Sequence, residues 1–323
     1  MERIETYKEN FVGYLNGKIG VKEPANLYEP IHYILEIGGK RLRPVLTLMT
    51  CDLFHGNVKN AYDAALAIEI FHNFTLVHDD IMDSAPIRRG HETVHKKWDI
   101  NTGILSGDAM LIMAYQCFEN YEEPVFKKLL KLFSKTSLEV CEGQQLDVDF
   151  ESRTDVNIPE YIQMITYKTS VLVAAAMKMG AIIAKVDNAE AELIYDFGLN
   201  LGIAFQLQDD YLDTFGDEAL FGKQIGGDIA ENKKTFLYLK AIEVCGIDDK
   251  EKLMDFYDAN AKNDNKIAKV TQIFNNNNIA EITIQEIERF TNKSFEILDK
   301  LSISNEKKAI LKNFGISLMK RTI

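Results

Sequence analysis

Two acidic boxes of identical spacing constrain this chain more than any other feature. The first is Asp79-Asp80-Ile81-Met82-Asp83 and the second is Asp209-Asp210-Tyr211-Leu212-Asp213. Each lies in an apolar stretch with a helical pattern, so the first and last carboxylates of a box stand at i and i+4 on one helix face. Like charges at this spacing repel each other, which indicates that the boxes bind a cation.

The residue types in the boxes point to magnesium and phosphate. Proteins hold Mg²⁺ through one or two carboxylates, while water and substrate phosphate oxygens complete the octahedron. Two such boxes therefore predict a diphosphate clamp. Solvated surface charge is the alternative, but apolar residues border both boxes, at 74–77 and 203–205. Neither box has the residue order of an EF-hand loop.

Basic residues near glycine-containing turns supply the complementary charge. The segment Gly38-Gly39-Lys40-Arg41-Leu42-Arg43-Pro44 is one cluster, Arg88-Arg89-Gly90 follows the first box, and Gly222-Lys223, Asp228 and Lys233-Lys234 follow the second. Arginine binds phosphate oxygens bidentately and lysine supplies a point charge. Each cluster alone is also compatible with ordinary surface charge, so the clusters carry weight only together with the boxes.

Length and apolar periodicity predict an all-α protein with a single domain over residues 1–323. Of its 323 residues, 46% are hydrophobic, which is enough for a large core. Apolar residues recur with helical spacing in segments such as 61–74, 125–140 and 193–205. Convincing alternating strands are absent, and no Pro/Gly/Ser-rich linker divides the chain.

Composition also excludes several classes of partner. The net charge of −12 argues against nucleic acid and against an anionic membrane surface. The longest hydrophobic runs, such as 171–177, fall far short of the roughly 20 residues that span a bilayer. The N-terminus has no apolar signal core, and the four cysteines form no close-spaced motif. We therefore expect a soluble protein in the reducing cytoplasm.

Five ordered motifs resemble those of the trans-type isoprenyl diphosphate synthases, also called polyprenyl synthetases. The similarity covers nearly the whole chain, through the motifs at 38–44, 72–83, 143–147, 205–210 and 222–235. Between its Asp pair and its last Asp the first box has two residues, where many bacterial short-chain members have four. In this respect the chain resembles the archaeal and eukaryotic pattern of farnesyl and geranylgeranyl diphosphate synthases.

The resemblance implies a homodimeric prenyltransferase of isoprenoid biosynthesis, with a helical bundle of the isoprenoid synthase type and a central active-site cavity. The expected reaction is Mg²⁺-dependent, head-to-tail trans condensation of isopentenyl diphosphate with allylic diphosphates of C5 to C15. It releases diphosphate and gives geranylgeranyl (C20) or farnesyl (C15) diphosphate. Three magnesium ions are expected with substrate bound.

The resemblance also implies roles for individual residues. Metal ligation is expected from Asp79, Asp83 and Asp209, with Asp80, Asp210 and Asp213 as outer or water-mediated partners. The leaving diphosphate is expected to contact Arg88, Lys168, Lys223 and Lys233. The expected anchors of isopentenyl diphosphate are Lys40, Arg43, His72 and Arg89, with Lys320-Arg321 a weaker candidate. Thr169 and Gln206 correspond to positions that steady the allylic cation, and Gln144 and Asp147 to a pair near the metals.

Product length is expected to depend on residues before the first box. At about 1.5 Å per residue, Thr75 lies roughly 6 Å and Phe71 roughly 12 Å before Asp79 along a helix, and Phe74 faces away and should serve as a wall. The family resemblance nevertheless implies that a bulky residue five positions before the first Asp, here Phe74, limits the length, so Phe71 and Phe74 compete as the stop. A small Thr75 lets the tail pass and Phe71 then arrests it, which predicts C20 product, with C15 accumulating when isopentenyl diphosphate is scarce. Alternatively, both phenylalanines are core packing. His78 is expected to be a hydrogen-bonded core histidine.

Two other functions remain compatible with the fold. A class I terpene cyclase shares the first box, but its second metal site is expected to read Asn/Asp-x-x-x-Ser-x-x-x-Glu, and this chain has a second Asp box instead. A non-catalytic helical subunit of a synthase typically loses Asp-box residues, and this chain keeps all six.

Overall fold

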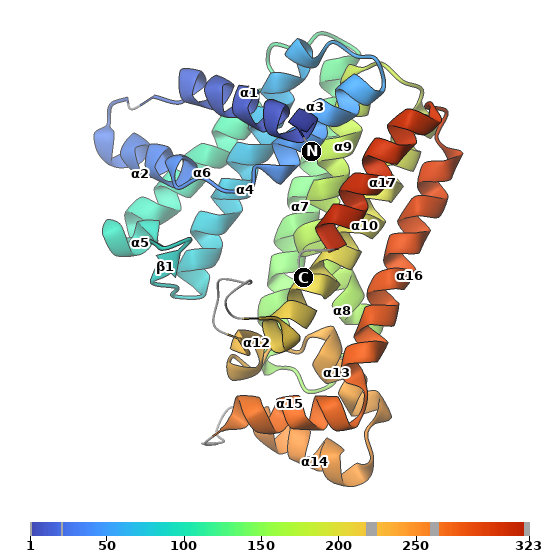
Figure 1. The fold of residues 1–323 in the computed structure, drawn as a ribbon. Helices are drawn as coiled ribbons and strands as arrows, with labels where there is room; N and C mark the ends of the chain where they lie inside the picture. Colours follow the sequence, from blue (N-terminus) through green and yellow to red (C-terminus); the bar gives the residue numbers. More distant parts are fainter. Residues whose placement is uncertain (1, 21, 218–224, 259–264, 320–323) are drawn as a thin grey trace. The chain divides into compact units, whose positions relative to one another are not determined.

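The protein is described from a computed structural model, and the description covers residues 2–20, 22–217, 225–258 and 265–319 (Figure 1). Within these ranges helices predominate, and the only sheet is a hairpin of β1 (Ile87–Arg88) and β2 (His91–Glu92). The prediction of an all-α fold is therefore confirmed. None of the helices in the described ranges combines the length and apolar composition that crossing a membrane requires.

The chain forms two compact units. Residues 1–134 and 175–192 make the first unit, and residues 135–174 and 193–323 make the second. The predicted single domain over residues 1–323 depends on how both units act together, and it stays a prediction.

The first unit is built around α4 (Tyr62–Met82), the helix that ends in the first Asp box. The other helices of this unit are α1 (Glu2–Lys18), α2 (Ala25–Glu36), α3 (Leu42–Leu53), η1 (Val58–Ala61), α5 (Val94–Lys97) and α6 (Ile100–Gln116). Helix α4 packs most extensively on α6 and α3. A Cβ at Gly107 of α6 would lie 2.2 Å from His78 Nε2, so Gly107 leaves room for the His78 ring where α6 packs on α4. This packing fixes the end of α4 that carries the carboxylates.

Three helices contribute residues to both units, namely α7 (Val125–Ser152), α9 (Val171–Ile183) and α10 (Asn188–Phe215). The second unit also contains α8 (Ile158–Ile165), the π-helix η2 (Thr166–Ser170), α12 (Gly227–Ala230), α13 (Phe236–Val244), α14 (Ile247–Phe256), α15 (Lys266–Asn276), α16 (Ile279–Lys300) and α17 (Asn305–Met319). Its core includes Tyr161, Leu207, Phe236, Phe274 and Phe290. Helices α16 and α17 lie side by side in the orange and red part of Figure 1.

Two local features of the second unit position its functional side chains. Helix α8 begins with a capping box in which Asn157 and Glu160 bond to each other's backbone N–H groups. It continues into η2, and such wide π turns often occur at functional sites. A Cβ at Gly143 of α7 would lie 2.2 Å from the backbone nitrogen of Lys168, so Gly143 lets α7 lie directly against this turn.

Candidate active site

The first Asp box closes α4. Asp79 lies in the last turn, and the backbone N–H of Asp83 donates to the Asp79 carbonyl at 2.9 Å, which confirms the predicted i, i+4 arrangement. Asp83 is exposed and Asp79 is half-buried. The C-terminus of a helix carries partial negative charge, so two carboxylates there are unfavourable without a cation.

The middle carboxylate of this box is neutralised by the protein. Asp80 is 1% exposed, and Arg88 Nε lies 2.8 and 2.9 Å from its two oxygens, while Arg88 Nη2 lies 2.7 Å from Oδ1. This fits the outer role expected for Asp80. Metal ligation by Asp79 and Asp83, and the contact of Arg88 with a diphosphate, stay predictions.

The hairpin after the first box brings two basic clusters together. Arg88 pairs with His91, and the connecting residues Arg89 and Gly90 have φ of 53° and 80°. Positive φ at both positions is the signature of a type I′ turn. The Arg89 guanidinium donates to the Gly38 carbonyl, and a Cβ at Gly39 would lie 2.6 Å from Arg89 Nη1. The glycines of the first basic segment therefore accommodate an arginine of the second.

A neutral histidine lies within this group of cations. Arg43 Nη1 is 3.1 Å from His72 Nε2, so His72 accepts there and carries its proton on Nδ1. Burial, followed by the charges of Arg43 and Arg89, lowers the pKa of His72 well below its ordinary value. Three of the four expected anchors of isopentenyl diphosphate are thus near one another, and the fourth, Lys40, belongs to the segment that Arg89 contacts.

Arg41 has a structural role. Its side chain is buried and donates to the Glu69 carboxylate and to the Leu35 carbonyl. Asn73 also donates to Glu69, at 3.1 Å. One of the three cations of the first basic segment therefore anchors the loop, and the role of Lys40 and Arg43 in binding isopentenyl diphosphate stays a prediction.

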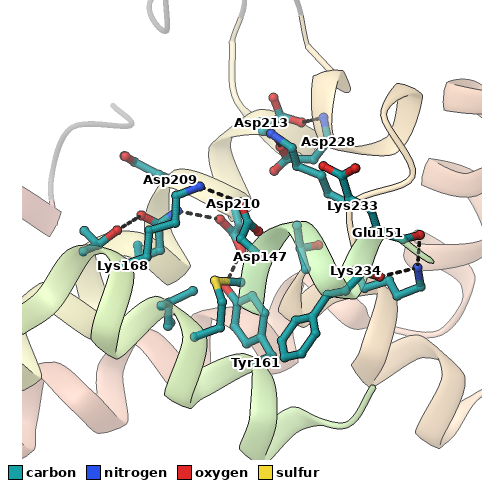
Figure 2. A pocket seen from close by; sticks show the side chains of 16 residues that line it. Asp147, Glu151, Tyr161, Lys168, Asp209, Asp210, Asp213, Asp228, Lys233 and Lys234 are labelled. Atoms are coloured by element: carbon teal, nitrogen blue, oxygen red, sulfur yellow. Dashed lines mark hydrogen bonds and ion pairs between the residues drawn. The ribbon is translucent and has the colours of Figure 1, made fainter. Parts of the chain in front are cut away.

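The second Asp box faces a cavity of about 200 Å³ within the second unit (Figure 2). Helices α7, α8, α10 and α12, the π turn η2 and the segment 233–235 all contribute side chains to it. The lining residues are Asp147, Phe150, Glu151, Tyr161, Met164, Ile165, Lys168, Thr169, Gln206, Asp209, Asp210, Asp213, Asp228, Lys233, Lys234 and Thr235.

Hydrogen bonds link the polar side chains of this cavity. Thr169 Oγ1 donates to Gln206 Oε1 at 3.2 Å, and Gln206 Nε2 donates to Asp210 Oδ1 at 3.0 Å. Tyr161 donates its hydroxyl proton to the other oxygen of Asp210. Lys168 donates to Asp147. As in the first box, the middle carboxylate is buried and bonded to protein donors.

The cavity holds more negative than positive charge. Six carboxylates and three lysines are among its lining residues. Asp213 Oδ2 accepts the backbone N–H of Asp228 at 2.9 Å, and burial, together with the charge of Asp213, raises the pKa of Asp228 to about 6. Burial likewise raises the pKa of Asp210. Crowded carboxylate oxygens of this kind fit Mg²⁺, and Asp209 is the residue here that would hold it directly, with Asp213 as an outer or water-mediated partner.

The lysines after the second box differ in their contacts. Lys233 lies 2.9 Å from Glu231 and 3.9 Å from Asp228. Lys234 donates to the carbonyls of Phe150 and Glu151, near the C-terminus of α7, and so stabilises that helix end. Lys223 and the Lys320-Arg321 pair lie outside the described residues.

The comparisons with known proteins agree with this geometry. The family model described as polyprenyl synthetase matches residues 24–274. The chain belongs to the polyprenyl synthetase family.

Relatives within the family are named after different prenyl diphosphate products. A geranylgeranyl diphosphate synthase of Methanosarcina mazei is 43% identical over 245 residues, which cover 75% of this chain and 76% of that protein. A geranylfarnesyl diphosphate synthase of Natronomonas pharaonis is 38% identical over 242 residues, covering 69% and 71%. A crystal structure of a geranylgeranyl pyrophosphate synthase is 54% identical, covers 99% of both chains and has a TM-score of 0.95.

The sequence alone did not predict two polar side chains that hold site residues in place, Tyr161 and Glu69. Tyr161, which bonds to Asp210, lies seven residues before Lys168, and that spacing of two helical turns was the available signal. Glu69 precedes His72 by three residues on α4, so both lie on one helix face, yet its burial with Arg41 depends on tertiary packing.

The residues expected to set product length lie in the first unit. Phe71 is completely buried and packs against Phe74 and Phe133, with ring centroids 5.5 and 5.3 Å apart. Thr75 donates its hydroxyl to the His72 carbonyl at 2.8 Å. His78 is hydrogen-bonded, as expected, with Nε2 3.3 Å from the Ile104 carbonyl. Phe71 and Phe74 thus share an aromatic cluster, and their effect on chain length stays a prediction.

Proposed function

We propose that this protein condenses isopentenyl diphosphate with allylic diphosphates of C5 to C15, head to tail and with Mg²⁺. The observation that carries the proposal is the cavity at the second Asp box, where carboxylates and lysines adjoin the apolar side chains of Phe150, Met164 and Ile165. The carboxylates, through Mg²⁺, and the lysines suit a diphosphate. The apolar side chains suit an allylic cation, which needs surroundings that exclude water. Membership of the polyprenyl synthetase family supports the same reaction.

Each part of the cavity has a task in this reaction. Magnesium, when bound, neutralises the negative charge that develops on the departing diphosphate. Lys168 and Lys233 add fixed positive charge on the same substrate group. Thr169 and Gln206 turn oxygen dipoles towards the allylic carbon as it becomes positive. The carboxylates of the second Asp box serve this leaving group through the metal that they would hold.

The second substrate uses different residues. Lys40, Arg43, His72 and Arg89 bind isopentenyl diphosphate through charge-assisted hydrogen bonds. This group consists of cations and a neutral histidine. A diphosphate held in this way is bound firmly but is not activated as a leaving group, so only the allylic substrate ionises.

The proposed product is geranylgeranyl diphosphate, with farnesyl diphosphate accumulating when isopentenyl diphosphate is scarce. Relatives of similar identity are named for C20 and C25 products, so identity alone does not decide the length. Phe71 supports C20 because it lies about one turn before Thr75 and two turns before Asp79 in α4, in an aromatic cluster with Phe74 and Phe133.

We also propose a cytoplasmic homodimer with three magnesium ions in its substrate complex. Helix α6, which packs on α4, exposes Ile104, Leu105 and Ile112, with exposed fractions of 41%, 60% and 59%. Exposed apolar side chains of this size on one helix suit a subunit interface. A monomeric species at micromolar concentration in light scattering would count against the dimer.

The proposed reaction is tested by incubating purified protein with labelled isopentenyl diphosphate and Mg²⁺, with and without an allylic primer. Elongation that needs the primer and stops on chelation of Mg²⁺ supports the proposal. Cyclisation of the primer without uptake of label would identify a terpene cyclase. No reaction under either condition would indicate a non-catalytic subunit.

A further inference from the structure

The geometry points to Tyr161 and Asp210 as positioning residues. They fix the orientation of the Gln206 amide, and the amide in turn fixes whether the lone pairs or the proton of the Thr169 hydroxyl face the allylic substrate. This inference rests on the proposed prenyl transfer. It assigns a role to a tyrosine that itself carries no charge and binds no metal in the proposed reaction.

The chain of hydrogen bonds has a direction. Tyr161 and Gln206 each donate to one oxygen of Asp210, so this carboxylate acts as an acceptor on both sides (Figure 2). Because Gln206 Nε2 is 3.0 Å from Asp210 Oδ1, the reversed amide would bring its carbonyl oxygen against a carboxylate oxygen. Two acceptors at that distance repel, so Asp210 selects the observed orientation.

The orientation of Gln206 then determines that of Thr169. With Oε1 facing Thr169, the hydroxyl donates its proton to the amide at 3.2 Å. A hydroxyl has one proton and two lone pairs. No residue in the described ranges donates to Thr169 Oγ1, so its lone pairs are directed to the cavity that Thr169 lines. A reversed amide would instead turn the hydroxyl proton towards the cavity.

This polarity suits the proposed reaction. Positive charge develops on the allylic carbon when the C–O bond breaks, and fixed oxygen lone pairs stabilise it at no reorganisation cost. Tyr161 is 1% exposed and is therefore held by packing as well as by its hydrogen bond. It anchors Asp210 from α8, whose side chains line the cavity together with those of α10.

The test is a double-mutant cycle between Tyr161→Phe and Thr169→Val, followed by kcat and both KM values at saturating Mg²⁺. Tyr161→Phe alone should lower kcat about tenfold and change both KM values less than about twofold. If Tyr161 acts through Thr169, the double variant should match Thr169→Val within about twofold. Multiplied losses, an unchanged kcat, or an effect confined to KM would overturn the inference.

Matched controls separate this role from packing. Tyr238→Phe removes another buried hydroxyl of the same unit, on a ring stacked 4.0 Å from Tyr257 and away from the cavity lining, and it should keep wild-type kcat. If Tyr161→Phe fails to fold, the cycle of Asp210→Asn with Thr169→Val decides by the same criterion, because Asp210 is the residue that joins Tyr161 to Gln206. Absence of elongation by the wild type would refute the proposed function, whereas an active wild type with multiplied losses would refute only this inference.

Discussion

Arg88 holds both carboxylate oxygens of Asp80 through its Nε, at 2.8 and 2.9 Å, in a pair whose acidic partner is buried. Removal of one member of such a pair leaves an uncompensated buried charge, which is more harmful than removal of both. The arrangement therefore couples the stability of the first Asp box to a residue expected to contact the allylic diphosphate.

Arg88→Ala should destabilise the protein by about 3 kcal/mol, and adding Asp80→Asn should restore most of that loss. Turnover should stay low in both variants because the diphosphate contact is missing. Denaturant unfolding and steady-state kinetics check the two parts separately. Equal stability of Arg88→Ala and the wild type would contradict the structural part.

Asp79→Ala and Asp209→Ala should each lower kcat by about a thousandfold or more, because each removes a proposed ligand of magnesium. Both variants should unfold no earlier than the wild type without Mg²⁺, since like-charge repulsion is relieved. The checks are turnover and thermal unfolding in chelator. Near-normal turnover in either variant would be incompatible with the assigned metal sites.

Arg43→Ala and Arg89→Ala should raise KM for isopentenyl diphosphate about ten- to a hundredfold, the cost of losing a charge-assisted hydrogen bond. Lys168→Ala should instead lower kcat with the allylic substrate, because Lys168 lines the cavity of the second box. Kinetics with each substrate varied in turn provide the measurement. The assignment of the two diphosphates to separate sites would be wrong if all three variants changed the kinetic constants of the same substrate to the same degree.

The Mg²⁺-free protein should lose stability as pH rises from about 4 to 6 through Asp228. Burial, followed by the Asp213 charge, raises the folded-state pKa of Asp228 to about 6 from 3.8, so the folded protein binds the proton more tightly. The stabilisation from this tighter proton binding is complete below pH 3.8 and is lost above pH 6. Asp228→Asn should abolish it, with a difference of about 3 kcal/mol at pH 7. The expectation would be contradicted if the free energies of unfolding of the wild type and of Asp228→Asn changed with pH in the same way from pH 4 to 7.

Phe71→Leu and Phe74→Ala should shift the products towards longer chains in at least one case, if this aromatic cluster limits growth. Leucine is the milder change at 71, because the fully buried Phe71→Ala would cost about 3–5 kcal/mol. Chromatography of the dephosphorylated products gives the distribution. An unchanged C15/C20 ratio in both variants would show that the limit comes from another helix.

Much of the fold and site follows from short-range patterns. Helical periodicity predicted α4 and α10, and the Asp spacing predicted that Asp79 and Asp83 lie one turn apart, as the structure confirms. The residue types of the basic clusters also indicated diphosphate chemistry. These inferences succeed because each depends on neighbours within about two helical turns.

Other features depend on tertiary packing and could not be predicted. Arg41 and Arg43 look alike in the sequence, and only the burial of Glu69 separates the structural arginine from the candidate ligand. The contact of Gly143 with the backbone of Lys168 joins two helices distant in the sequence, and the π turn is not visible in any apolar pattern.

The contact between Gly39 and Arg89 has a consequence for variation within the family. A Cβ at position 39 would lie 2.6 to 3.1 Å from three atoms of the Arg89 guanidinium, so a side chain there would displace this guanidinium from the Gly38 carbonyl. In an alignment, side chains at position 39 should therefore be more frequent among members without arginine at position 89. The two basic segments should evolve as one covarying unit, although 49 residues separate them.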